Sequence, residues 1–578
     1  MAMLPTFDYE YSEREITDTF GGYHRARKIG AGEFYDTENL SSAEYPLLSN
    51  RKKRGLVRRL SAPGGMLAKE KLAYVEGGTL YYDDAPTPLS GLAPGKKQLV
   101  SMGATLVVFP DRCYYNTADP GDCGSLDAVY RSTGAVEYAL CAEDGTRWER
   151  PLRSDAPPET PGDGQLWMDT AASPPRLKRY AAAEGIWEAL TTVYTRVQFI
   201  SEGELPALFR QYDGVTISGG DEAVGGEKIL QAVGGGEGEL DYLVVAGLYT
   251  GEGEQTQGSV CIERRAPEMD YVIECRNRLW GCRYGGGLNE IYCCALGDFR
   301  NWRQYQGLST DSWTASVGSD GPWTGAVNYF GYPLFFKENR IHRVTVSASG
   351  AHALSETVCR GVQSGCSESL QVVNETLLYK SRADVCAYQG GFPRSVSEHL
   401  GEGNWSEAAA GCIGERYYLS MKNEQGAWSL FVYDLRRELW MREDSLCVRR
   451  FAALGDELYA MTDESLLALL GSRGEKEPYV PWMAETGMLY YQQPERKYVS
   501  RFQLRLWMEE GASLEVYVMY DSDGQWVRQG RIRMKGTRSV TLPVRPRRCD
   551  HLRIRLVGRG EARLYSVAKI LTLGSDVG

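Results

Sequence analysis

The chain lacks the residue patterns by which many metal-binding and membrane proteins are recognised. Its 578 residues include only five histidines, which share no spacing, and its 14 cysteines form no C-x-x-C pair. No run approaches the roughly 18 apolar residues of a membrane helix, and the N-terminus lacks the basic and apolar regions of a secretion leader. We therefore expect no metal site, no membrane contact, and thiols kept reduced in the cytoplasm.

Recognisable nucleotide-binding and catalytic motifs are also missing. Gly220 and Gly225 have the spacing of a phosphate-binding loop, but Gly226 and Glu227 stand where such a loop needs Lys and then Ser or Thr. The positions of the histidines do not indicate a catalytic triad. Because triad members lie far apart in sequence, their spacing does not test for one either. The sequence predicts no catalytic residue and no cofactor, and therefore a protein that is not an enzyme.

Glycine and aromatic residues are abundant instead. The chain has 65 Gly, 36 Tyr and 13 Trp, a combination that suits short strands joined by tight turns. An irregular repeat runs along it: a short apolar strand, a polar or glycine turn, then an apolar residue and usually an aromatic one. Its copies include LAYVEGGTLYY (72–82), LVVFPDRCYY (106–115), YVIECRNRLW (271–280), PLFFKENRIH (333–342), LQVVNETLLY (370–379), AAGCIGERYY (409–418) and FAALGDELYA (451–460).

From residue 341 onward these copies are spaced by roughly forty residues, which is typical of propeller blades. One such hairpin unit cannot bury both faces alone, so the units are expected to stack around an axis. The stretch NRLWGCRYGGGLNEIYCCALGDFRNW (277–302) is then the middle of a blade, with a glycine hinge at 285–287 and with Trp280 and Trp302 as packing residues. The sequence predicts an all-β fold whose propeller has six to eight blades.

The repeat is interrupted and then ends, which defines the remaining domains. A Pro-rich linker (153–164) and glycine-rich segments replace it, so a small β-rich domain is expected to be inserted between two blades. Six alternating segments near the C-terminus predict a β-sandwich that stands apart. The expected domains are an N-terminal arm (1–50), a first propeller segment (51–143), the insert (144–266), a second propeller segment (267–475) and the C-terminal sandwich (485–578).

Charge is distributed unevenly along the chain. The net charge is −11, but residues 496–578 hold 17 basic and 8 acidic side chains, so this segment carries +9 and the remainder −20. The densest basic runs are RKKRG (51–55) and RPRRCDH (545–551). The ordinary explanation of both is a solvated turn, and the more specific hypothesis is a contact with a polyanion or another subunit. We expect Arg545, Arg547 and Arg548 to contact an acidic surface of a neighbouring subunit or of another protein of the same assembly. The alternatives are that these arginines only keep a small domain soluble, or that they contact DNA.

Several long stretches resemble structural proteins of tailed phages and prophages, and more distantly the tail-hub (packaged-DNA stabilisation) proteins of short-tailed phages. They are residues 277–302, 310–344, 359–390 and 545–578, with a module at 164–180. The resemblance implies a non-enzymatic virion protein in the tail or head–tail connection, assembled in the host bacterial cytoplasm. It also implies a homo-oligomeric ring, with other tail or connector proteins as partners; in that setting the DNA that the C-terminal arginines would contact is the DNA leaving the particle.

A second hypothesis is a receptor-binding protein, or a propeller that binds or cleaves a glycan. Propellers present side chains around a central mouth, and this chain is rich in aromatic residues and carboxylates. A glycan hydrolase needs two carboxylates roughly 5–10 Å apart, and the sequence does not pair them.

Overall fold

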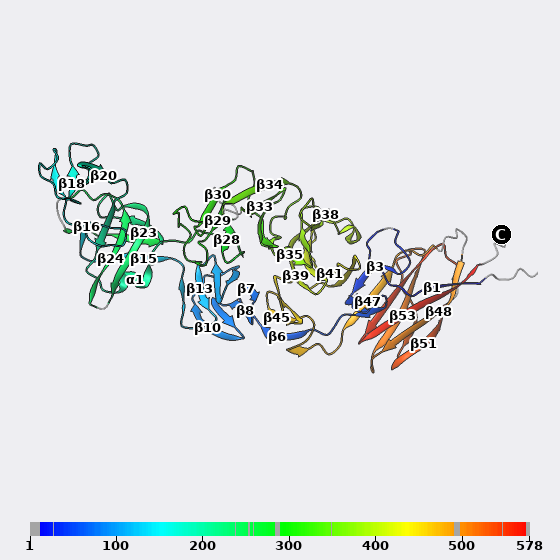
Figure 1. Cartoon of the computed structure of the whole chain (residues 1–578). Helices are drawn as coiled ribbons and strands as arrows, with labels where there is room; N and C mark the ends of the chain where they lie inside the picture. The colour runs from blue at the N-terminus through cyan, green and yellow to red at the C-terminus, as the bar shows by residue number, and fades with distance from the viewer. Residues whose placement is uncertain are drawn as a thin grey trace, which may run out of the picture.

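The computed structural model describes residues 12–26, 28–236, 238–251, 255–257, 259–283, 289–347, 350–490, 497–545 and 547–573. Figure 1 shows three β-rich bodies in a row: the insert, a ring of blades and a C-terminal sandwich. The predicted fold class, an interrupted propeller with an inserted domain and a sandwich, is confirmed. Within the described ranges the only α-helix is the short α1 (Glu204–Leu208). No helix there has the length and apolarity to cross a membrane.

The described residues form a propeller of seven blades, within the predicted six to eight. Each is an antiparallel sheet in which consecutive strands pair from the axis outward. Blade one comprises β7 (Pro63–Ala68), β8 (Leu72–Glu76), β9 (Thr79–Tyr82) and β10 (Ala85–Ser90). Blade two comprises β11 (Gln98–Met102), β12 (Thr105–Phe109), β13 (Cys113–Asn116) and β14 (Cys123–Ser125). Blade three comprises β27 (Tyr271–Glu274), β28 (Leu279–Cys282), β29 (Glu290–Cys293) and β30 (Trp313–Ser316).

Blades four to six follow the insert and blade three without a further interruption. Blade four comprises β31 (Gly325–Tyr329), β32 (Tyr332–Lys337), β33 (Arg340–Val346) and β34 (His352–Val358). Blade five comprises β35 (Gln371–Val373), β36 (Thr376–Lys380), β37 (Val385–Tyr388) and β38 (Arg394–Ser395). Blade six comprises β39 (Trp405–Ile413), β40 (Arg416–Asn423), β41 (Trp428–Asp434) and β42 (Leu439–Asp444). The inner strands of neighbouring blades contact one another around the ring, with the 3-10 turn η1 (Ser367–Ser369) helping to join blades four, five and six.

Blade seven closes the ring with strands from both ends of the propeller sequence. β43 (Arg450–Leu454), β44 (Glu457–Met461) and β45 (Ser465–Ala468) are completed by β6 (Gly55–Arg59), which pairs with β45 and with β46 (Glu475–Lys476). The first blade therefore cannot separate from the last without breaking these strand pairs.

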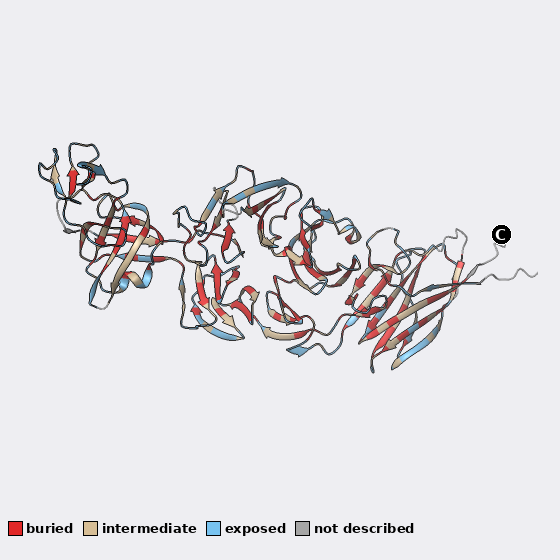
Figure 2. Cartoon of the chain, viewed as in Figure 1, coloured by how far each residue is buried: buried red, intermediate tan, exposed pale blue. Residues whose placement is uncertain are grey.

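Burial explains why whole strands are apolar. All five residues of β12 and of β36 are buried, because each blade is covered on both faces by its neighbours. Figure 2 shows buried residues concentrated along the central strands of the blades and of the sandwich. Trp280 and Trp302 are 2% and 3% exposed, so their predicted packing role is confirmed. The glycines at 285–287 lie outside the described residues.

The insert leaves the ring between blades two and three. Its first strand starts at Ala128, before the boundary expected at 144, because β15 and β16 pair with strands of the insert rather than with a blade. The Pro-rich stretch at 153–164 lies inside the insert, as the loop between β17 and β18, and not at its start. An eight-stranded sheet comprises β15 (Ala128–Arg131), β26 (Cys261–Arg264), β22 (Gly214–Ser218), β23 (Gly226–Gly236), β24 (Glu239–Ala246), β21 (Tyr194–Gln198), β16 (Ala135–Cys141) and β25 (Gln255–Gln257). A smaller sheet comprises β17 (Leu152–Ser154), β18 (Leu166–Asp169), β19 (Arg176–Ala181) and β20 (Ile186–Ala189).

The C-terminal sandwich incorporates the N-terminal segment. One sheet contains β1 (Ser12–Thr17), β4 (Leu40–Ser41), β5 (Leu48–Asn50), β53 (Ala562–Leu573), β48 (Lys497–Met508) and β51 (Gly536–Pro543). The other contains β2 (Gly22–Tyr23), β3 (Glu33–Glu38), β47 (Pro481–Thr486), β52 (Leu552–Arg559), β49 (Ser513–Tyr520) and β50 (Val527–Ile532).

The expectation that the sandwich stands apart is wrong. Its second sheet is continuous with blade six, because Tyr23 of β2 pairs with Trp440 of β42. Leu439 and Met441 of blade six are also buried in the core of the sandwich. Edge strands that would otherwise be exposed are thus paired with each other.

The basic run at 51–55 is not a solvated turn. Arg51 and Arg54 are buried and form ion pairs within the chain, Arg51 with Glu477 and Arg54 with Glu443. The sequence could not show this, because the acidic partners are about 390 to 430 residues away. The run connects the closing strand β6 to blades six and seven, and its two arginines are not free for a polyanion.

Candidate functional site: the mouth of the propeller

The best-defined candidate site is a cavity at one end of the propeller axis. The fourth strand of each blade runs antiparallel to the first, so it ends at the face where the next inner strand begins. Loops between blades therefore gather at one mouth. A cavity of about 300 Å³ is lined there by Pro63, Gly64, Gly95, Lys96, Gly365, Glu368, Glu407, Ala408, Ala409, Val448, Arg449, Arg450, Met461 and Asp463.

Glu368, in η1, is held between two cations from other blades. Its carboxylate lies 3.3 Å from the ammonium of Lys96 and also pairs with the guanidinium of Arg450. Arg450 is buried and donates to the carbonyl of Lys97 at 2.9 Å, so its position is fixed from blade two.

Glu407 enters the cavity from a distorted portion of blade six. The pairing of β39 with β40 shifts register between Ser406 and Ala409, and Glu407 has a φ of 47°. Residues other than glycine and Asn rarely adopt this left-handed backbone conformation. A bulge of this kind changes the direction in which a side chain points. The Glu407 carboxylate lies 2.7 Å from Lys422 and 3.3 Å from Arg449. The hydrogen bond from Lys422 is the main cause of its lowered pKa.

The two glutamates flank one cavity because their supporting segments touch. The backbone N–H of Ala408 lies 3.4 Å from the sulfur of Cys366, which joins β39 to the turn that carries Glu368. Across the mouth, Asp463 is held 2.9 Å from Arg449. The cavity therefore presents carboxylate acceptors beside guanidinium and ammonium donors, a set that suits a ligand with several hydroxyl groups.

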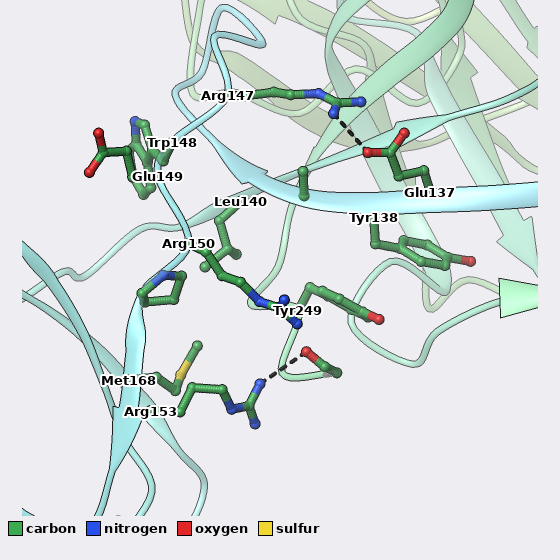
Figure 3. A pocket seen from close by; sticks show the side chains of 13 residues that line it. Glu137, Tyr138, Leu140, Arg147, Trp148, Glu149, Arg150, Arg153, Met168 and Tyr249 are labelled. Carbon is green, nitrogen blue, oxygen red and sulfur yellow. Dashed lines mark hydrogen bonds and ion pairs between the residues drawn. The ribbon is translucent and has the colours of Figure 1, made fainter. Parts of the chain in front are cut away.

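A second cavity, of about 170 Å³, lies in the insert (Figure 3). Arg147 pairs with Glu137 of β16 at 2.7 Å, and Arg153 donates to the carbonyl of Gly251 at 3.0 Å. Tyr138 stacks on Tyr249 at 5.0 Å between ring centroids. Both arginines are therefore already paired, and the cavity lies between β16 of the larger sheet and Met168 of the smaller sheet of the insert.

The three arginines predicted to contact a partner lie elsewhere. Arg545, Arg547 and Arg548 are exposed on the loop between β51 and β52, and none of them lines the axial cavity. Arg547 lies 3.2 Å from Asp523 of the same domain, and its guanidinium is 5.2 Å from the ring centroid of Tyr520. Their contact with a neighbouring subunit stays a prediction.

Sequence reasoning missed every charged residue of the mouth, although a weak signal exists. Arg449 and Arg450 directly precede the repeat copy at 451–460, and Glu407 precedes the copy at 409–418. Polar residues just before the first strand of each repeat are the ones that a propeller brings to its mouth.

Comparison with known proteins gives similarity in fold alone. No family model matches the chain, and no curated protein matches it. Among solved structures, an exo-β-1,3-galactanase from Phanerochaete chrysosporium is 10% identical, with a TM-score of 0.23 over 52% of this chain and 95% of that one. A bifunctional GH43-CE protein from Bacteroides eggerthii is 9% identical, with a TM-score of 0.21 over 53% and 62%. A glycoside hydrolase family 43 arabinoxylan arabinofuranohydrolase from Bacillus subtilis is 9% identical, with a TM-score of 0.17 over 69% and 93%.

The expectation that the chain is not an enzyme is contradicted: the solved structures with which it shares a fold include a glycoside hydrolase of family 43. The expectation relied on the absence of a sequence motif. That inference was unsound for a propeller, in which residues of one site come from separate blades and leave no common spacing.

Proposed function

We propose that this protein binds a glycan at the mouth of its propeller. The observation that carries the proposal is Glu407, held in a left-handed conformation at a bulge that directs its carboxylate to the axial cavity. Backbone strain of this kind persists where the surrounding structure maintains it and is concentrated at functional sites. Neighbouring sugar hydroxyls can donate to Glu368 and Glu407 and accept from Lys96, Arg449 and Arg450.

The same geometry supports cleavage as a second candidate. Glycoside hydrolysis uses two carboxyl groups that flank the bond to be broken, one as acid and one as base or nucleophile. Glu368 and Glu407 approach the cavity from different blades and are the natural pair. In the free protein both are paired with cations, so a bound sugar would have to displace or share these contacts.

A glycan array probed with the full chain tests binding, and release of reducing ends from the bound glycans tests cleavage. The informative variants are Glu368→Gln and Glu407→Asn, because Asn tolerates the left-handed backbone. Glu510→Gln, on a largely exposed carboxylate of the sandwich, is the matched control. We expect saturable binding that weakens at least about tenfold in the two mouth variants, or about 1.4 kcal/mol, and is unchanged in the control.

Absence of saturable glycan binding, or equal binding by all variants, would contradict the proposal. Binding without release of sugar, in wild type and control alike, would leave a binding protein and remove the hydrolase candidate. Release that disappears in Glu368→Gln would establish cleavage.

For the setting of this activity we propose a tailed-phage virion, on the resemblance described above. A glycan-binding propeller fits a region of the particle that meets the host surface, and a ring of such chains would bind with avidity. Mass spectrometry of purified particles should detect the chain in intact virions. Its absence from them would refute this placement without touching the glycan proposal.

A further inference from the structure

Two histidines and a glutamate meet where the N-terminal segment lies against the outer edge of blade six. His24 follows β2, Glu33 begins β3, and His399 lies in the 3-10 turn η2 (Glu398–Leu400) between blades five and six. The His24 Nδ1 atom is 2.8 Å from the Glu33 Oε2 atom, and the rings of His24 and His399 are 4.1 Å apart between centroids. One ligand atom from each residue lies within 4.8 Å of the others.

We propose that His24, Glu33 and His399 bind a divalent transition-metal ion, with Zn²⁺ as the best match. Two imidazole nitrogens and a carboxylate oxygen are donors that zinc accepts at about 2.0–2.2 Å. Three protein ligands leave the fourth tetrahedral position for water. The side chains of His24 and Glu33 are 20% and 22% exposed, so solvent and the ion reach the cluster.

The backbone holds these ligands in place without the ion. The N–H of Gly30 donates to the Glu33 Oε2 atom at 2.6 Å, and the N–H of Arg25 donates to the carbonyl of His399 at 2.8 Å. The second bond ties the segment that carries His24 directly to the turn that carries His399. Main-chain hydrogen bonds therefore bring together metal-ligand side chains from two distant regions of the chain.

Only local movement is needed to admit the ion. Tetrahedral coordination places two ligand atoms roughly 3.4 Å apart, so the 2.8 Å contact between His24 and Glu33 must open slightly and lose its shared proton. The His399 ring must also turn out of the stack so that its nitrogen points to the same centre. Both are side-chain movements at a surface position.

The ion would stabilise the junction between the propeller and the C-terminal sandwich. His24 and Glu33 flank a loop between β2, which pairs with blade six, and β3, which pairs with β47 of the sandwich. Metal binding at this position would join that loop to η2 of the propeller. The site is independent of the proposed glycan site, because none of its residues lines the axial cavity.

Titration of the chelator-treated full chain with ZnSO₄, followed by calorimetry, tests the proposal, and CoCl₂ reports the coordination geometry by visible absorption. We expect one ion per chain and a tetrahedral cobalt spectrum. Glu33→Gln should weaken binding at least tenfold, and His399→Ala should abolish it. His551→Ala is the control, because His551 also lies against a carboxylate, 3.0 Å from Asp550, but has no second histidine.

Wild-type protein that binds no stoichiometric zinc would overturn the proposal, as would Glu33→Gln and His399→Ala variants that bind like wild type. Circular dichroism checks that each variant is folded. If His399→Ala does not fold, Glu33→Gln alone decides, because Gln still accepts the hydrogen bond from Gly30 while removing the charge.

Discussion

Replacing Arg54 by Met should weaken closure of the propeller more than any other change in the basic run at 51–55. Arg54 precedes the closing strand β6 and is 5% exposed in its side chain. Its guanidinium lies 2.7 Å from Glu443 and 2.5 Å from Asp444, at the end of the outer strand of blade six. Arg54→Met keeps most of the side-chain volume but leaves two carboxylates without their cation.

The magnitude follows from burial. Removing one partner of a buried ion pair costs about 3–5 kcal/mol, since the remaining charge is neither paired nor solvated. Asp444 is 20% exposed and can regain some water, so the lower end of this range is expected. Lys52→Met, on an exposed side chain of the same run, should change stability by no more than about 0.5 kcal/mol.

The penalty should also depend on pH. Burial raises the pKa of Glu443 above its ordinary value even beside Arg54. Without Arg54 the folded state binds this proton still more readily than the unfolded state, so the variant gains stability as the pH falls and loses it as the pH rises. The difference between Arg54→Met and wild type should therefore shrink between about pH 8 and pH 5.

Guanidinium unfolding of the full chain, followed by tryptophan fluorescence and limited proteolysis at both pH values, measures this. The reasoning is refuted if Arg54→Met is as stable as Lys52→Met at the higher pH. It is also refuted if the loss is the same at both pH values, because an unpaired Glu443 charge would then not be the cause.

Three further predictions concern the junction, the thiols and the basic loop. Gly22→Ala should lower the free energy of unfolding by at least about 1 kcal/mol and speed proteolysis of the N-terminal segment. The reason is that φ of Gly22 is 86° and the added Cβ would lie 2.5 Å from a carbonyl oxygen of β42. The control Gly162→Ala, where the added Cβ has no neighbour within 4 Å, should have neither effect. Eight of the nine buried cysteines, all but Cys261, should resist iodoacetamide at about pH 8 in native protein. Burial raises the pKa of these eight thiols, that of Cys294 to about 12, and so keeps them protonated. Rapid labelling of all eight, read by peptide mass spectrometry, would contradict this. Arg547→Glu with Arg548→Glu should leave the sandwich folded and abolish ring or particle assembly, and unchanged assembly at low and physiological salt would refute the predicted subunit contact.

The strands, the blades and the order of the bodies along the chain could be predicted from the sequence alone. Alternating apolar residues, tight-turn glycines and the roughly forty-residue repeat are local signals, because a strand and its hairpin partner are neighbours in sequence. The copies at 333–342 and 451–460 each mark a hairpin of one blade, β32–β33 and β43–β44. The loss of the repeat marked the insert for the same reason, although only strand pairing shows that the insert begins at Ala128.

Contacts between distant segments were decided only by the tertiary structure. β6 completes a blade whose other strands follow about 390 residues later, and the pairing of β2 with β42 makes one sheet of a blade and the sandwich. The same is true of Glu368 and Glu407 at the mouth, and of His24 and His399 at the junction. The two glutamates line one cavity because the blades close into a ring, and the two histidines stack because the N-terminal segment pairs with the outer strand of blade six. Neither event leaves a spacing in the sequence, since the partners are set by three-dimensional packing and not by distance along the chain.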